Sequence, residues 1–232
     1  MSLLNDTHLK ALLEGSFEAR LLQSAYSRIH DYNDPLRGPI FALLMRELIR
    51  IVMERLAPDN TVLQASWCKG DPWTYFDREG NIKVTGRSRY RFAVTGTISD
   101  LKIAQYPELD CTPTIAALVS LVAKLNKYAH VSPGTFDLTV DQTTDFLGEV
   151  ESVVSDYAQT LTKAKISIKD IMWTIVDESV NQHVLSAIPG ELDALSGQTV
   201  VNNIHIEELQ EFDTTTLTPV LTGSGVAEIE LN

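Results

Sequence analysis

The sequence predicts an α+β protein: a mainly α-helical N-terminal domain over residues 1–190, followed by a small antiparallel β module over 191–232. Apolar residues recur at helical spacing in several stretches before residue 190. Polar and apolar residues alternate in the shorter stretches after it, with turn-forming residues between them. A chain of 232 residues, 44% of them hydrophobic, can also bury a core of normal size.

Five amphipathic helices are expected in the helical domain. Prolines end the first two, at Pro35 and Pro58, because proline disfavours helix in the residue before it. Ser167 and Asp170 resemble a capping box that starts the fifth helix. The expected helices cover roughly 7–30, the stretch from the turn at Gly38-Pro39 to Pro58, 113–130, 140–163 and 167–188.

The segment 59–112 interrupts these helices as an irregular, basic insertion. Its part SWCKGDPWTYFDREGN has the glycines and proline of a loop or short hairpin. Residues 89–94 alternate between polar and apolar, which favours a strand, but Arg87, Tyr90 and Val94 also share a helical face. From the residues alone, helix and strand both stay open for 86–98.

Beyond residue 190 the stretches VVNNIHIEEL, TLTPVL and VAEIELN alternate, and the turns DTTT and TGSG separate them, which predicts a three-stranded meander. The charge changes as well. Eleven of the 31 acids follow Lys169, the last base, so the first 169 residues hold 20 acids and all 19 bases. Because Lys and Arg supply most of the affinity for nucleic-acid phosphates, a nucleic-acid surface is expected only in the first part of the chain.

The sequence lacks the signatures of several other protein classes. Cys68 and Cys111 form no CxxC pair, so neither a disulfide framework nor a zinc site is expected, and a reducing cytoplasm fits. There is no GxxxxGK[ST] loop and no GxGxxG run, and His8, His30, His183 and His205 have no ligand-spaced partners apart from the weak pair Asp6 and His8, so no cofactor and no metal are expected. Neither a signal peptide nor a run of about 18 apolar residues is visible, so no membrane partner is expected.

The first candidate site is NKYAH, at the end of the third expected helix. Lys124, Lys127 and His130 follow one another at three-residue spacing. Cations at a helix C-terminus stabilise the macrodipole by about 0.3–1 kcal/mol each, which is a sufficient structural reason for all three. The functional alternative uses His130 as acid or base, Lys124 to hold a phosphate, Asn126 to orient it and Lys127 as a further nucleic-acid contact.

The second candidate is KVTGRSRYRF, which has four cations in ten residues. Lys83, Arg87, Arg89 and Arg91 would bind phosphates while Tyr90 stacks on a base. The alternative is an amphipathic element whose arginines pair with acids elsewhere in the chain.

A third charged stretch, MRELIRIVMER, places Arg46 and Arg50 four residues apart, with Glu47 and Glu54 beside them. On a helix this spacing is typical of a solvated or interhelical ion-pair face. We therefore expect a structural role for these four side chains.

Several motifs resemble a known family by their order along the chain: FALLMRELIRIVMERLAP, SWCK, GRSRYRFAVTGTISD, LNKYAHVSPGTFD and VLTGSGVAEIEL. Together they are similar to the predicted PIWI-associated nucleases, group 2, of bacterial conflict systems. The most specific pieces are RELIRxxxxRLAP and LNKYAHVSPGTFD. The resemblance covers most of the chain and implies a helical N-terminal part, a small β C-terminal module, a helical 86–98 and a role in phage defence.

The stretch KLNKYAH is also similar to the HEPN ribonuclease motif, an arginine followed four to six residues later by a histidine. His130 matches the histidine, and Lys124 falls where the arginine would be. Lysine keeps the charge but loses the bidentate fork on phosphate. The resemblance implies a HEPN-like helical bundle and a homodimer, since HEPN domains generally build their site across a dimer.

Two functions follow from these observations. The first is a cytoplasmic antiphage-defence component that binds RNA or cleaves it without a metal. The second is a non-catalytic accessory subunit that oligomerises and docks a larger defence effector protein through its acidic C-terminal module. A basic cleft shared by His130, Lys124 and Arg87 or Arg91 would favour the enzyme.

Overall fold

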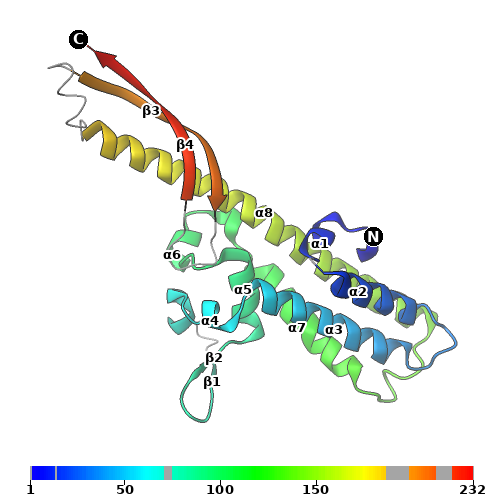
Figure 1. Cartoon of the computed structure of the whole chain (residues 1–232). Helices are drawn as coiled ribbons and strands as arrows, with labels where there is room; N and C mark the ends of the chain where they lie inside the picture. The colour runs from blue at the N-terminus through cyan, green and yellow to red at the C-terminus, as the bar shows by residue number, and fades with distance from the viewer. Residues whose placement is uncertain (1, 14, 71–74, 187–198, 213–220, 232) are drawn as a thin grey trace. The chain divides into compact units, whose positions relative to one another are not determined.

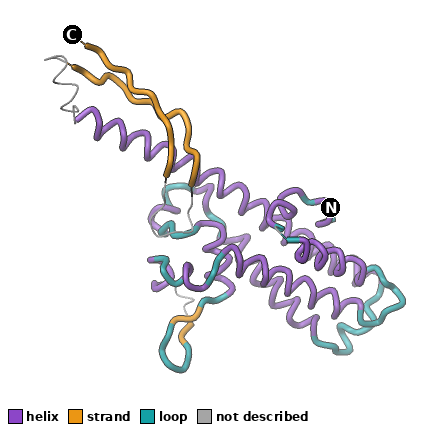
Figure 2. The backbone as a smooth tube through the Cα atoms, in the orientation of Figure 1, coloured by secondary structure: helices purple, strands orange, loops and turns teal. Residues whose placement is uncertain are grey.

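The structure is a computed structural model that describes residues 2–13, 15–70, 75–186, 199–212 and 221–231. The chain forms two compact units, Met1–Lys165 and Ile166–Asn232. Most of the described residues are helical, and the described strands form two separate two-stranded antiparallel sheets (Figure 2). The predicted fold class is therefore confirmed at the level of a mainly helical chain with a small β part.

The first unit is built from short and long helices joined by tight turns. Its helices are α1 (Thr7–Leu12), α2 (Ser16–Ile29), α3 (Arg37–Leu56), α4 (Asp59–Val62), α5 (Gly86–Thr95), α6 (Asp100–Ile103), α7 (Thr112–Ala129) and the first part of α8 (Val140–Ser186). Three 3-10 turns lie at Leu3–Asn5, Ser66–Gly70 and Pro107–Leu109. A small hairpin pairs β1 (Tyr75–Phe76) with β2 (Ile82–Lys83).

Helix α3 is the centre of this unit and lies between α2 and α7 (Figure 1). Aromatic rings join three of the helices. The Phe41 ring of α3 meets the edge of Phe146 of α8 at 5.6 Å between centroids, and Tyr128 of α7 stacks on the same Phe146 ring at 4.2 Å. Such aromatic pairs add to the area-based burial energy and fix how the helices face one another.

The first predicted helix, 7–30, is in fact two helices. Asp6 caps α1 by accepting a hydrogen bond from the Leu9 backbone N–H at 2.9 Å, and α1 ends after one and a half turns. Gly15, with extended backbone angles, is the N-cap of α2. The periodicity of the apolar residues continues across the break, so it did not reveal the break.

The predicted turn at Gly38-Pro39 is also wrong, because both residues lie in the first turn of α3. Proline is tolerated there since the N–H groups of a first turn have no partner within the helix. Gly38 is needed for packing: a Cβ at this position would lie 2.6 Å from Cδ1 of the buried Leu138. The chain segment after α7 therefore approaches the start of α3 closely.

Helix α8 is continuous, so the predicted separate helices over 140–163 and 167–188 are corrected to one. Ser167 lies inside it and is not an N-cap. The sequence from Val140 to Ser186 has no proline and a single glycine, Gly148, so nothing in it breaks the hydrogen-bond ladder.

The segment left open between helix and strand is the helix α5, as the family resemblance implied. Thr85 caps it, its hydroxyl accepting a hydrogen bond from the Ser88 backbone N–H at 3.1 Å. Alternation misleads here because α5 is buried on more than one side. Phe92 packs into a cluster with Trp67 and Cys68, whereas Tyr90 meets the edge of Tyr157 at 6.1 Å.

The second unit contains the antiparallel strands β3 (Thr199–Phe212) and β4 (Leu221–Leu231). The first and last predicted strands of the meander therefore pair directly. The predicted TGSG turn is wrong, since Thr222–Gly225 pair with β3 as part of β4. Two of the three register irregularities in this pair fall opposite its glycines, Gly223 and Gly225, where strands commonly form bulges. Most of the predicted middle strand, 216–221, and the predicted domain boundary at 190 lie outside the described residues.

Within the described part of the chain, no helix is both long enough and apolar enough to cross a bilayer.

Candidate functional site

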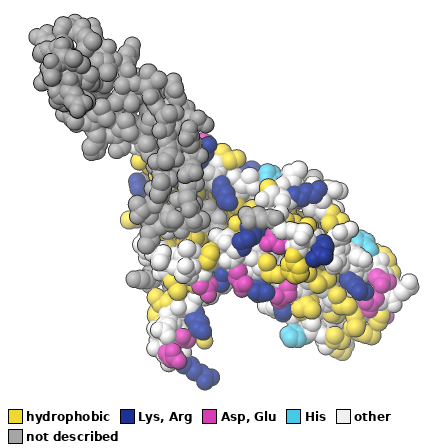
Figure 3. Space-filling model, in the orientation of Figure 1, with side chains coloured by type: hydrophobic (Ala, Val, Ile, Leu, Met, Phe, Trp, Pro, Cys, Tyr) yellow, Lys and Arg dark blue, Asp and Glu magenta, His cyan; other side chains and the backbone are white. Residues whose placement is uncertain are grey.

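A cavity of about 430 Å³ opens between α3, α5 and α7. We call it the arginine groove. Its polar lining consists of Arg46, Glu47, Arg50, Glu54, Arg89 and Asn126. Basic and acidic side chains are interspersed over the face of the helical unit shown in Figure 3. The arginine groove likewise contains both positive and negative side chains, and these are paired with one another inside the cavity.

Helix α3 presents one face to the core and another to the groove. Met45, Leu48 and Val52 are buried at helical spacing, which leaves Arg46 and Arg50, four residues apart, on the opposite side. The position of the arginines is thus a consequence of amphipathicity. Burial of the apolar face fixes the orientation of α3 about its own axis, and this orientation places Arg46 and Arg50 at the groove.

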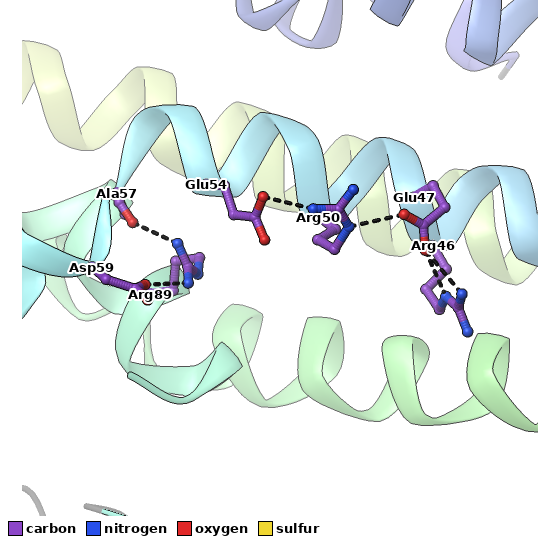
Figure 4. A network of polar contacts seen from close by, with 7 residues as sticks. All are labelled: Arg46, Glu47, Arg50, Glu54, Ala57, Asp59 and Arg89. Atoms are coloured by element: carbon purple, nitrogen blue, oxygen red, sulfur yellow. Dashed lines mark hydrogen bonds and ion pairs between the residues drawn. The ribbon is translucent and has the colours of Figure 1, made fainter. Parts of the chain in front are cut away.

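The charged side chains of α3 form a continuous row of ion pairs (Figure 4). Arg46 Nη2 lies 2.9 Å from Glu47 Oε1, and Arg50 Nε lies 2.8 Å from Glu47 Oε2. Arg50 also contacts Glu54, with 2.6 Å between Nη1 and Oε2. The predicted ion-pair face is present, and it also forms one wall of the groove.

Hydrogen bonds from Arg50 and then Arg46 hold the pKa of the Glu47 carboxyl below its ordinary value of 4.5. We expect Arg50→Gln to raise the pKa of Glu47 towards 4.5, measured by NMR titration of the side-chain carboxyl. A depressed folded-state pKa stabilises the fold above the unfolded pKa, and this contribution is lost as the pH falls through the folded value. Arg20→Gln, on an exposed position of α2, is the control, and an unchanged Glu47 pKa in Arg50→Gln would contradict the pairing.

Arg89 reaches the groove from α5. Its Nη1 donates to the Ala57 carbonyl at the end of α3 at 2.9 Å, and its Nη2 contacts the carboxylate of Asp59 (Figure 4). The guanidinium therefore joins the start of α5 to the end of α3. This anchor holds a third cation at the groove independently of the row on α3.

Asn126 contributes the amide of the groove from α7, where its Oδ1 accepts from Arg46 Nη1 at 3.4 Å. Val122, one turn earlier, lines the same cavity. His130 follows Asn126 by four residues, at the point where α7 ends, and it is not among the residues that line the groove. His130 is the C-cap of α7, is exposed, and its carbonyl accepts from the Thr135 hydroxyl at 2.8 Å.

Lys124 lies on another side of α7. Its ammonium pairs with Glu149 of α8 and stands over the rings of Tyr128 and Phe146 at 5.8 and 5.7 Å. The structure therefore brings Asn126 together with Arg46 and directs Lys124 towards α8. Lys127, the fourth side chain predicted for this site, is exposed near the end of α7.

The predicted cluster on 83–92 is divided among several environments. Arg89 lines the arginine groove and Arg87 lines a neighbouring cavity. Arg91 stacks over the Trp67 ring at 4.0 Å and contacts Asp100 at 2.5 Å. Lys83 is exposed on β2.

Tyr90 is buried, which raises the pKa of its phenol above the ordinary value, so its ring is a neutral wall. The Tyr90 ring packs against the edge of the Tyr157 ring inside the protein, and the Tyr90 backbone carbonyl accepts a hydrogen bond from the Tyr157 hydroxyl at 2.8 Å. Stacking of a base on the full face of Tyr90, as predicted from the sequence, is therefore restricted to the part of the ring that borders the cavities.

Arg46 and Arg50 are functional candidates that the sequence did not reveal, because only a structural ion-pair role was predicted for them. The local pattern of MRELIRIVMER fits an ion-pair face equally well. What distinguishes the groove is Arg89, which is distant in sequence and meets α3 only in the folded chain.

The fold and the groove define a mainly helical protein with a cavity lined by arginine and glutamate side chains. The chain matches the family model described as "Predicted pPIWI-associating nuclease" over residues 9–156, and it belongs to this family. The match supports the family and not the group number within it. Searches of curated proteins and of solved structures found no match.

Proposed function

We propose that this chain handles nucleic acid as the associate of a PIWI-like protein, and that it binds the sugar–phosphate backbone in the arginine groove. The family description supports the first part, since it names a predicted nuclease and a PIWI association. The observation that carries the proposal is the convergence of three guanidinium groups, from Arg46, Arg50 and Arg89, on one cavity.

The pairing within the groove leaves room for phosphate. Arg50 donates to glutamates through Nε and Nη1, and a guanidinium carries five N–H donors, so it can bind further acceptors at the same time. Three arginines and two glutamates line the groove, and the third arginine, Arg89, is paired with Asp59 outside the lining, so phosphate would bind through the remaining guanidinium N–H donors and not through an excess of charge. Arginine forks match phosphate oxygens, and this contact is worth more than a neutral hydrogen bond.

Helical spacing also suggests a cleavage chemistry for an RNA strand in the groove. His130 would accept the proton of a 2′-hydroxyl, and the 2′-oxygen would then bond to phosphorus while the P–O5′ bond breaks. A proton returned by water or by the imidazolium would complete the 5′-hydroxyl. Arg46 and Asn126 would hold the phosphate, so Arg46 takes the role that the sequence assigned to Lys124, which is paired with Glu149.

The cleavage part is tested with His130→Ala on a single-stranded RNA. We expect the rate to fall by about 100-fold or more, the range for loss of a general acid–base group, while affinity stays within about twofold. His8→Ala, on α1, is the matched control and keeps the wild-type rate. Equal cleavage by His130→Ala and wild type would sink the catalytic role. Binding without cleavage by either protein would sink it too, and would favour the accessory-subunit function.

A further inference from the structure

A second cavity, of about 480 Å³, lies beside the arginine groove between α5 and α7. Its walls are mainly apolar, with Ala116, Val119 and Val122 from α7 and the Tyr90 ring from α5. We call it the apolar pocket. Its volume is within the range of pockets that hold small ligands or ligand parts.

The two cavities are adjacent. Gly86, Tyr90 and Val122 line both, so a ligand that extends from the arginine groove across these three residues would reach the apolar pocket. One side of this shared boundary is charged and the other is apolar. That combination matches a ligand that is anionic at one end and flat and apolar at the other.

Gly86 lies at the boundary of the two cavities. A Cβ at this position would meet the Tyr90 ring, with 3.4 Å to Oη and 3.5 Å to Cζ. The glycine is the first residue of α5, and its backbone does not require positive φ, so the conformation itself does not call for glycine. A methyl group at Gly86 would lie in van der Waals contact with the Tyr90 ring and occupy space beside the part of the ring that lines both cavities.

The apolar pocket is accessible from α7. Ala116, Val119 and Ser120 are exposed, and Val119 keeps 37% of its surface accessible. Exposed apolar side chains are ordinary when scattered, but here they line a hollow that adjoins a charged groove. Because the pocket lies next to the proposed phosphate site, the occupant is expected to be part of the same ligand.

We propose that the apolar pocket receives an unpaired base of the strand whose phosphates lie in the arginine groove, so that the ligand is single-stranded nucleic acid. The inference rests on the proposed function of the groove. A single strand can turn a base out of its backbone and place its π-face against apolar and aromatic walls. A duplex keeps its bases stacked inside, so it can offer the groove phosphates but can offer the pocket nothing.

Ala116→Gln tests the pocket without changing charge. Glutamine is a good helix former and its side chain would extend into the pocket from an exposed position. Ala117→Gln is the matched control, because Ala117 is the next residue of the same helix, is also exposed and lines neither cavity. The probes are a short single-stranded oligonucleotide, a strand of the same length made of abasic residues, and a duplex, each followed by fluorescence anisotropy.

We expect Ala116→Gln to weaken single-strand binding by about fivefold or more, the lower end of what one stacked base contributes. Binding of the abasic strand should stay within about twofold, and Ala117→Gln should bind all three probes as wild type does. Wild type should prefer the base-bearing single strand to the other two probes.

Gly86→Ala is a second variant at the pocket, and it tests whether the loss of binding in Ala116→Gln could come from unfolding. Alanine favours helix over glycine, so the melting temperature should stay equal or rise, while single-strand affinity falls in the same direction as for Ala116→Gln.

Equal loss for the base-bearing and abasic strands, or no loss for either, overturns the base pocket while the groove stands. If wild type binds the base-bearing strand, the abasic strand and the duplex equally, and if Arg46→Gln and Arg50→Gln leave this binding unchanged, the groove is overturned as well. A pocket variant that changes only the binding of a protein partner also overturns the base assignment.

Discussion

Replacing Arg46 and Arg50 together with glutamine is expected to weaken the binding of a short single-stranded oligonucleotide by about 10- to 100-fold at low salt. Each charge-assisted phosphate contact is taken as worth about 0.7–1.4 kcal/mol at this partly exposed wall, and 1.4 kcal/mol is a factor of ten. Glutamine keeps a hydrogen-bonding side chain of similar length, so the loss reports the guanidinium charge. Fluorescence anisotropy measures the affinity.

Two further variants make this result specific. Arg20→Gln removes the same charge from an exposed position of α2 outside the groove and should bind as wild type does. Glu47→Gln removes the carboxylate that both arginines contact, so it should strengthen binding. If Arg20→Gln weakened binding as much as a single groove arginine, the effect would be one of net charge and the groove would not be the site.

Arg37→Met is expected to lower the free energy of unfolding of the helical unit by about 2–5 kcal/mol. Arg37 is 3% exposed, and its guanidinium donates to the backbone carbonyls of Tyr32, at 3.0 Å, and of Leu138. It also donates to the Thr143 hydroxyl at 3.4 Å. Methionine fills a similar volume but leaves these buried acceptors without a donor, and each unsatisfied acceptor costs about 1–3 kcal/mol.

Urea unfolding followed by circular dichroism measures this loss. Arg28→Met, at an exposed position of α2, is the control and should change stability by less than about 0.5 kcal/mol. A loss below about 1 kcal/mol in Arg37→Met would mean that water satisfies the carbonyls, and that Arg37 does not link α3 to the segment before α8 as described.

Helix existence could be predicted from this sequence better than helix boundaries. Apolar periodicity identified the stretches that form α2, α3, α7 and α8, because burial of one face fixes the spacing of apolar residues. It did not reveal the break at Gly15 or the continuity through Ser167, because both depend on local backbone hydrogen bonds that periodicity does not report. Tertiary packing on two sides explains why α5 carried an alternating pattern.

The site was harder to predict than the fold. Asn126 and Arg89 were selected from the sequence and line the groove, but their partner α3 was assigned an ion-pair role. Lys124 was selected by its spacing to His130, yet the facing helix supplies Glu149 and takes it away from Asn126. Which face of α7 meets which neighbour is set by packing between segments far apart in sequence, and no local pattern records it.

The most direct test of the central claim, that nucleic-acid phosphates lie in the arginine groove, is the salt dependence of single-strand binding. Each phosphate neutralised on a single strand contributes a slope of about −0.7 to the plot of log affinity against log salt concentration. The double variant of Arg46 and Arg50 should therefore show a slope about 1.4 shallower than wild type, while Arg20→Gln keeps the wild-type slope. Equal slopes for wild type and the double variant would contradict the account.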